Sequence, residues 1–454
     1  MPDGEHLGLT ESVSIALGGM IGGGIYAVLG VVTRITGAAT WFAFVLAGVV
    51  ALCAGYSYIV LNRVMDEEKD QRGGSVSFVQ CFTGNTTLAG VVGWTLLFGY
   101  VGSMAMYAFA FAEFATTLPG VPESAAGLPL RPVISVAAVV GFVALNLLGA
   151  RATGTTENVL VVGKIAVLVA FGVGGIAYAL TASPDPVHMG LSNLTSFGPV
   201  MAAGVSFVAF QGWQLLFYDQ ETIADPVDTI RKAVYISIPV AVAIYVVVAV
   251  ATYNLAPTAL AHHPHTALKN AAATMASPLG LGGTAAIVIS LSALLSTGSA
   301  INATLFSAGH FAKGLLSRDL LPDRIGDGGA DGVPERTLLA LGGVTALLTA
   351  WGSLDAITSF ASVSFIVVFG GMSALAVRHR DVDHVNPVPP LVGTVGSVGF
   401  VPVMLYHLYD AEFETFVMVC VLGVFVIGVE LLYFERELLQ EEVEMIENDV
   451  RGML

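Results

Sequence analysis

Five glycines interrupt an apolar stretch near the N-terminus that is long enough to cross a lipid bilayer. The stretch runs from about residue 9 to 35, and from Gly18 to Tyr26 it reads GGMIGGGIY. Glycine favours a break in a helix, and lipid cannot satisfy the N–H and C=O groups that a break releases. Such a break must be buried in protein or line a cavity. The sequence therefore predicts a binding site at mid-membrane depth.

Composition places the whole chain in the membrane. Its 454 residues are 55% hydrophobic and 11% charged, with a mean hydropathy of +0.79, whereas an ordinary soluble domain is about 25% charged. Runs of roughly 20 apolar residues are long enough to span. They predict an all-α, polytopic protein with about twelve transmembrane helices, near 9–35, 39–61, 88–118, 132–150, 157–182, 198–218, 233–256, 281–312, 337–351, 355–377, 389–408 and 414–434.

Basic residues predict the orientation, because an excess of Lys and Arg in short loops stays cytoplasmic. One set of loops, together with the C-terminal tail, holds most of them: Arg63, Lys69, Arg72, Arg151, Arg231, Lys232, Lys313, Arg318, Arg324, Arg336, Arg378, Arg380, Arg436 and Arg451. The opposite loops hold only Arg34, Arg131 and Lys269. We expect a multi-pass protein of the cell (plasma) membrane with both termini in the cytoplasm.

The net charge and the cysteine content limit which partners and cofactors are expected. The net charge of −16 argues against a nucleic-acid partner. An excess of acidic residues is also typical of the protein surfaces of salt-accumulating halophiles. The three cysteines are scattered, so neither a disulfide framework nor a metal site is expected. The histidines near residues 262–265 favour a solvated loop over a surface metal site. We expect membrane lipid around the chain and no cofactor, and the oligomeric state is left open.

Two interrupted spans predict an internal repeat. The first span is interrupted at residues 22–24 and the sixth at residues 209–212, five spans later. Corresponding interruptions in two halves indicate an inverted repeat of five plus five helices, with the site between the broken helices. We expect a transport core at 1–379, with repeats at about 8–182 and 196–379. Two peripheral helices at 380–434 and an acidic amphipathic cytoplasmic tail at 435–454 follow.

The glycine-rich break predicts an anion site. Free N–H groups at Gly22, Gly23 and Gly24 would lie at the start of a half-helix, where the dipole favours a carboxylate. The alternative is a close helix crossing, for which small residues serve equally well.

The sixth span supplies the complement, because carbonyls that lose their helical partners can accept from an ammonium group. The predicted amine-binding carbonyls are those of Met20, Val208, Ala209 and Gln211. The predicted pocket wall is Phe207, Phe210, Trp213 and Thr304, with Tyr26 and Gln214 as gate residues. Ordinary packing of the aromatic residues, and an interhelical hydrogen bond for Gln214, are the alternatives.

Lys164 lies within an apolar run, where a charge is expensive and indicates function. Two roles are open, a fixed ammonium between helices in place of sodium, or a proton carrier that sets the conformation. Snorkelling to the membrane surface is the structural alternative. In the eighth span Ser296, Ser299 and Asn302 could hydrogen-bond this lysine or a cation, or could join helices.

Several motifs together resemble the amino acid, polyamine and organocation (APC) transporter superfamily. They are GGMIGGGIY, AFQGW, ETIADPVDTIRKAV and SAINATLFSAGHFAKGLLSRDLLP, and the match covers most of the first ten spans. Gly23 replaces the usual Ser or Ala, Gln214 stands where an acid is common, and Asp225 replaces an Asn. The resemblance implies a LeuT-like 5+5 inverted repeat with discontinuous helices 1 and 6, alternating access and an amino acid substrate. Lys164 falls where sodium-independent, proton-coupled members carry a lysine in the fifth helix.

These expectations define a secondary active transporter rather than an enzyme. We expect neutral amino acids, moved by proton coupling or exchange without sodium. A cationic amino acid or polyamine carrier and a non-transporting amino acid receptor on the same fold are the alternatives.

Overall fold

The computed structural model describes residues 6–69, 71–122, 124–125, 127–148, 154–182, 185–218, 220–326, 329, 333–382 and 385–429. Helices dominate these residues. Their bounds are α1 Leu9–Thr36, α2 Thr40–Lys69, α3 Ser75–Thr83, α4 Thr86–Thr116, α5 Leu130–Leu147, α6 Gly154–Thr181, α7 Gly198–Val205, α8 Pro226–Leu255, α9 Pro257–His262, α10 Ala267–Ala276, α11 Gly282–Leu316, α12 Glu335–Trp351, α13 Leu354–Arg378, α14 Val388–Ala411 and α15 Phe413–Val429. A two-stranded hairpin, β1 Ser124–Ala125 with β2 Leu128–Pro129, is a small exception to the all-α expectation.

Each predicted apolar run coincides with one of these helices or, in the sixth run, with a broken helix. Eight helical stretches of the described chain are long and apolar enough to cross a membrane, the first of them containing both α1 and α2. Local capping sets some boundaries: the Asn85 side chain accepts from the Leu88 amide at 2.8 Å and starts α4. The chain is a multi-pass membrane protein.

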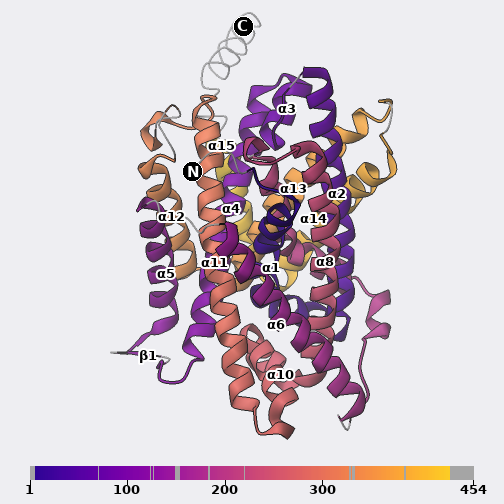
Figure 1. Ribbon diagram of the computed structural model, residues 1–454, viewed down its shortest axis with the longest axis vertical. Coiled ribbons are helices and arrows are strands. Elements are labelled where there is room, and N and C mark those ends of the chain that lie inside the picture. The colour runs from indigo at the N-terminus through magenta and orange to yellow at the C-terminus, as the bar shows by residue number, and fades with distance from the viewer. Residues whose placement is uncertain are drawn as a thin grey trace, which may run out of the picture.

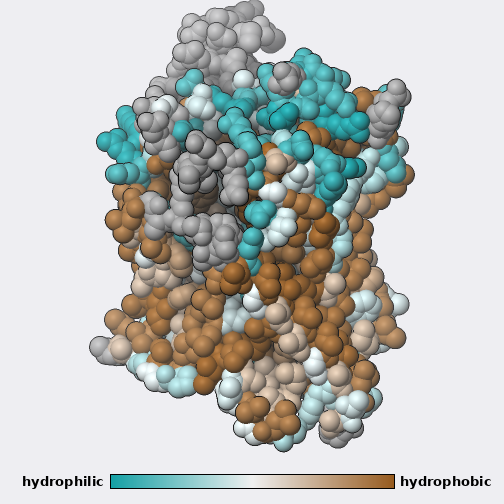
Figure 2. Space-filling model, viewed as in Figure 1, coloured by the Kyte–Doolittle hydropathy of each residue, from teal (hydrophilic) through white to brown (hydrophobic). Residues whose placement is uncertain are grey.

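The helices stand roughly side by side around α1, which lies in the interior (Figure 1). α1 packs against α8 and α11, and its residues from Ala16 to Val32 are almost all buried. Hydrophilic residues gather at the end that carries α3, whereas apolar residues cover the middle (Figure 2). This distribution fits a membrane protein whose apolar middle section faces lipid.

The predicted interruption of the first span is wrong for this structure. α1 runs as one helix from Leu9 to Thr36, through all five glycines. A helix can include glycine when its neighbours bury it, because tertiary packing overrides intrinsic propensity.

The sixth span is interrupted where the sequence predicts it. α7 passes into a 3₁₀ helix, η3 (Ser206–Phe210), and a second, η4 (Trp213–Phe217), follows. Between them Gln211 is extended and Gly212 has a φ of 140°. That backbone conformation is open to glycine and strained for other residues.

The division into two repeats and peripheral helices stays a prediction. The predicted tail helix at 435–454 lies outside the described residues.

Candidate functional site

The break in the sixth span touches the backbone of α1. A methyl carbon on Gly19 would lie 2.7 Å from Gly212 Cα, and one on Gly212 would lie 2.8 Å from Met20 N. These distances are shorter than van der Waals contact, so only glycine fits at either position. The two elements therefore meet main chain to main chain.

Side chains lie against Gly22, Gly23 and Gly24 of α1. A methyl carbon would lie 2.5 Å from Ala300 Cβ at Gly22, and 1.8 Å from the Tyr107 ring at Gly23. At Gly24 it would lie 2.5 Å from the Tyr245 hydroxyl. This is the close packing of small residues named above as the alternative. The free N–H groups predicted at these glycines are not formed here, because α1 is continuous.

Two predicted amine-binding carbonyls converge on one point. The Tyr245 hydroxyl of α8 lies 2.6 Å from the carbonyl oxygen of Met20 and 2.8 Å from that of Ala209. One carbonyl comes from α1 and the other from the broken span. A phenol has one hydrogen to donate, whereas an ammonium group has three. The phenol can therefore donate to these two carbonyls only in turn or through one shared hydrogen.

The predicted carbonyl of Val208 already has a hydrogen-bond partner within the broken span. The Val208 carbonyl accepts from the Gln211 amide at 3.2 Å, within the 3₁₀ geometry, so it is not the free acceptor we predicted. Ser362 of α13 stabilises this segment from outside, because its hydroxyl donates to the Val205 carbonyl at 2.6 Å and accepts from the Val208 amide at 3.0 Å. Sequence reasoning missed Ser362, although it is a polar residue within an apolar run.

Two glutamines bridge the break. The Gly212 amide donates to Gln214 Oε1 at 2.6 Å, and Gln214 Nε2 donates to Gln211 Oε1 at 3.2 Å. Gln211 Nε2 in turn donates to the Tyr107 hydroxyl. Both glutamine side chains are buried. This chain of bonds links the broken span to α4 beside Gly23, and sequence reasoning missed Tyr107.

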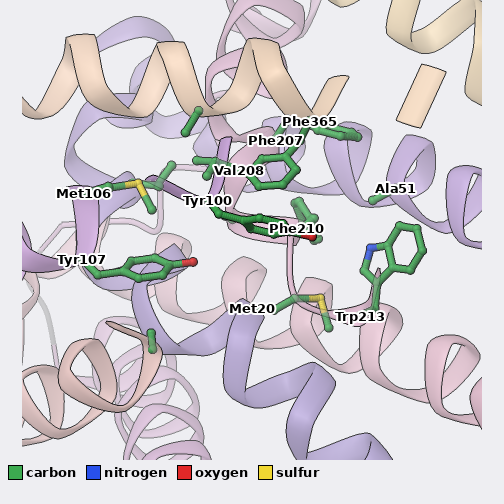
Figure 3. Packing of buried hydrophobic residues seen from close by; sticks show 14 of the residues in the cluster. Met20, Ala51, Tyr100, Met106, Tyr107, Phe207, Val208, Phe210, Trp213 and Phe365 are labelled. Atoms are coloured by element: carbon green, nitrogen blue, oxygen red, sulfur yellow. The ribbon is translucent and has the colours of Figure 1, made fainter. Parts of the chain in front are cut away.

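Figure 3 shows the predicted wall residues Phe207, Phe210 and Trp213 among the buried side chains near Met20, and their ring contacts divide them into two groups. Phe210 packs against Tyr245, with ring centroids 5.3 Å apart, and so lies at the convergent carbonyls. Phe207 contacts Phe369, and Trp213 contacts Tyr58 and Phe369, in an aromatic cluster with α2 and α13. For Phe207 and Trp213 the structure thus shows the packing alternative.

Lys164 of α6 reaches α1 next to the glycines. The lysine is 5% exposed, and its Nζ donates to the Gly18 carbonyl at 3.1 Å. This contact makes snorkelling to the membrane surface wrong for Lys164 here.

The predicted polar residues of α11 have different neighbours. The Ser296 carbonyl is near Gly22, and Ser299 donates to that carbonyl at 3.0 Å. Asn302 accepts from Asn146 of α5 at 2.9 Å, so it joins two helices as in the alternative reading. Thr304 is fully buried, and its hydroxyl has no hydrogen-bond partner in the described part of the chain.

Tyr26 joins α1 to α11 on the other side of the glycines. Its hydroxyl lies 2.8 Å from Ser292 Oγ, and its ring meets Phe114 edge-on at 5.7 Å. Along α1 it lies between the central glycines and Gly30, where the helix contacts Pro264.

A broken span that rests on a glycine-rich helix, inside a bundle of membrane-spanning helices, defines a transporter of the LeuT fold. The chain belongs to the amino acid permease family, whose model matches residues 7–431. The inner membrane transport protein YbaT of Escherichia coli is 28% identical over 89% of this chain and 91% of its own length. The branched-chain amino acid permease BcaP of Lactococcus lactis is 23% identical over 86% and 87%.

A manganese transporter of Eremococcus coleocola has the same fold. Its structure covers 95% of both chains with a TM-score of 0.61 and 12% identity, which shows the fold alone. Among the described residues of the present chain, no three His, Cys, Asp or Glu side chains lie close enough to hold a metal ion.

Proposed function

We propose that this transporter carries amino acids through the membrane by alternating access, with the substrate between α1 and the broken span. The convergence of the Met20 and Ala209 carbonyls supports this proposal most directly. The substrate ammonium group takes the position of the Tyr245 hydroxyl hydrogen. There its three N–H groups can donate to the carbonyls of Met20 and Ala209. The Gln211 carbonyl, at the break itself, is the third acceptor that we assign to it.

The substrate carboxylate binds the N–H groups of Gly22, Gly23 and Gly24 once α1 unwinds around them. Unwinding is cheap at this place, because each glycine makes a helix about 0.5–1 kcal/mol less stable than alanine does. Tyr107 covers Gly23 in the present structure, so its ring must leave before a carboxylate can approach. The substrate thus competes with packing inside the protein.

We assign a neutral amino acid as the substrate. The buried polar residues of the described chain are hydroxyl and amide residues and one lysine, without a carboxylate that could pair a cationic side chain. Phe210 offers an apolar wall beside the carbonyls. The branched-chain substrate in the name of the relative from Lactococcus lactis points the same way.

We further propose that Lys164 couples transport to protons and that sodium is not required. The lysine places a cation beside the α1 carbonyl of Gly18, where it links α6 to the element that must unwind. Loss of its proton would weaken that link. The rate of transport would then depend on whether Lys164 is protonated.

The proposal includes an orientation of the chain in the membrane. We place both termini in the cytoplasm of the cell membrane, from the distribution of basic residues. The end with α3 then faces the cytoplasm and the end with α10 faces outward (Figure 1).

Uptake by the purified protein in proteoliposomes tests these points. Radiolabelled leucine is supplied under an imposed pH gradient, with and without sodium. We expect uptake that an inward proton gradient stimulates, that sodium does not change, and that excess unlabelled leucine inhibits. Inhibition by lysine instead would indicate a cationic substrate, and binding without flux would contradict transport of this substrate.

A further inference from the structure

The loop between α8 and α11 folds over the end of α1. Residues 257–276, which we call the lid, form α9, the 3₁₀ helix η6 (Pro264–Thr266) and α10. The lid rests on α1 at Gly30, where a methyl carbon would lie 2.3 Å from the carbonyl oxygen of Pro264. One turn further along α1, Arg34 forms an ion pair with Asp355 at the start of α13. The lid therefore closes this end of the bundle directly on α1.

His265 of η6 contacts α4. Its ring meets Phe109 edge-on, with centroids 5.8 Å apart. The guanidinium carbon of Arg131 lies 3.9 Å from the centroid of the same phenylalanine ring. His265 Nε2 is buried and has no hydrogen-bond partner within the described residues. A neutral ring tolerates this position, whereas a charged ring would bury an N–H donor without an acceptor.

Charged groups of α1, α5 and α13 influence the pKa of His265. Burial is the largest influence and lowers the pKa of His265, and Arg34 and Arg131 lower it further. Asp355 acts in the opposite direction.

Four further titratable groups, on the lid and on α4, are not among the influences on the pKa of His265. They are Glu113 of α4, His262 of α9, His263, and Lys269 of α10. Of these, Glu113 interacts with His263 and Arg131. The closed lid thus favours the neutral form of His265.

We propose that His265 is a proton-sensitive latch, whose neutral ring holds the lid closed on α1 and whose protonation releases it. The inference rests on the proposed alternating access, in which this end must open to admit substrate. When the lid lifts, water solvates the ring, and its pKa returns toward the usual value of about 6.5. Because the open form then binds a proton more tightly than the closed form, acid shifts the population toward the open form. A difference of one pKa unit between the two forms changes their ratio up to about tenfold.

Thiol labelling of the lid measures its opening without any substrate. In a background with Cys53, Cys81 and Cys420 replaced by alanine, Thr266→Cys puts a thiol on the buried side of the lid, where Thr266 is 8% exposed. Ala261→Cys in the exposed part of the lid corrects for the effect of pH on the maleimide reaction itself. The measured quantity is the ratio of the two labelling rates in the purified full-length protein between pH 7.5 and 5.5.

We expect this ratio to rise at least about threefold on acidification, and to stay flat in His265→Gln and His265→Asn, which cannot titrate. The matched control His262→Gln changes an exposed histidine of the same lid and should keep the rise. A flat ratio with His265 intact would overturn the latch, as would a rise that survives both His265 variants. Either result would leave the uptake experiment above unaffected, so the two proposals fail separately.

Discussion

Glycines of similar sequence context do different things in this chain. Gly23 and Gly371 both lie inside apolar helices, yet Gly23 faces the Tyr107 ring and Gly371 has nothing within 4 Å of a methyl carbon. The absence of a side chain is required at Gly23 and incidental at Gly371. Replacement of each by alanine separates the two cases.

We expect Gly23→Ala to reduce leucine uptake by at least about tenfold, because its methyl group displaces Tyr107 and blocks the main chain that the carboxylate needs. Gly371→Ala is the matched control. It should keep uptake and raise the free energy of unfolding by up to about 1 kcal/mol, since alanine is the better helix former. Wild-type uptake in Gly23→Ala would show that the substrate does not approach this glycine.

Lys164 is the residue whose charge we link to coupling. In Lys164→Ala we expect uptake to lose its stimulation by a proton gradient, because the ammonium group that contacts the Gly18 carbonyl is gone. Counterflow, measured with equal pH on both sides, reports whether the site still binds and moves substrate. Lys232→Ala removes an exposed lysine from a surface ion pair with Asp228, which is worth little, and should behave as wild type. Proton stimulation that persists in Lys164→Ala would contradict the coupling role.

Hydrogen bonds from α13 help to stabilise the broken sixth span. Ser362 of α13 both donates to and accepts from the main chain of this span, at Val205 and Val208. A continuous helix would satisfy these groups internally, whereas a 3₁₀ segment leaves some of them to outside partners. One side chain of α13 thus replaces part of the helical bonding.

Ser362→Ala should lower the free energy of unfolding by about 1–3 kcal/mol, because it leaves a buried amide and a buried carbonyl without their partner. Ser373→Ala is the control from the same helix, since that buried serine donates to the Phe369 carbonyl of its own helix at 2.8 Å. Thermal unfolding in detergent, followed by the fluorescence of the tryptophans, compares the two. Equal loss of stability in both variants would show that the contact between helices adds nothing.

Contacts close the molecule at both ends of α1. Before the helix, Leu7 pairs with the segment after the broken span, with Leu7 N donating to the Thr222 carbonyl at 2.8 Å. At its other end the ion pair of Arg34 with Asp355 lies beside the lid. Since the central glycines are packed as well, α1 is held at both ends and in its middle, and under the proposed alternating access these contacts would break one after another.

Arg34→Gln should raise the lid-labelling ratio at Thr266→Cys at every pH, because it removes one tie between α1 and α13. The side chain of Arg34 is 44% exposed, so the pair contributes at most about 1 kcal/mol and the increase should stay below about fivefold. The pH dependence should remain but weaken, since His265 is still present while Arg34 no longer helps to lower its pKa in the closed lid. An unaltered ratio would mean that the ion pair does not hold this end closed.

The sequence alone predicted most of the architecture. Twelve apolar runs coincide with the helical elements, because the length of a membrane-spanning helix follows from the thickness of the bilayer. The break at Gly212 was also predictable, since few residues other than glycine accept its backbone conformation. Lys164 was found as a buried charge, because an isolated cation in an apolar run has few structural explanations.

Tertiary packing decided what the first-span glycines do. Their sequence fits both an unwound anion site and a close helix crossing, and the Tyr107 ring, the Tyr245 hydroxyl and Ala300 select the crossing here. Tyr107, Tyr245 and Ser362 come from helices distant in sequence, so no local pattern marks them as partners of the break. Residue order determines which segments lie in the membrane and where the chain bends easily, whereas the partners of each main-chain group depend on which helices meet in space.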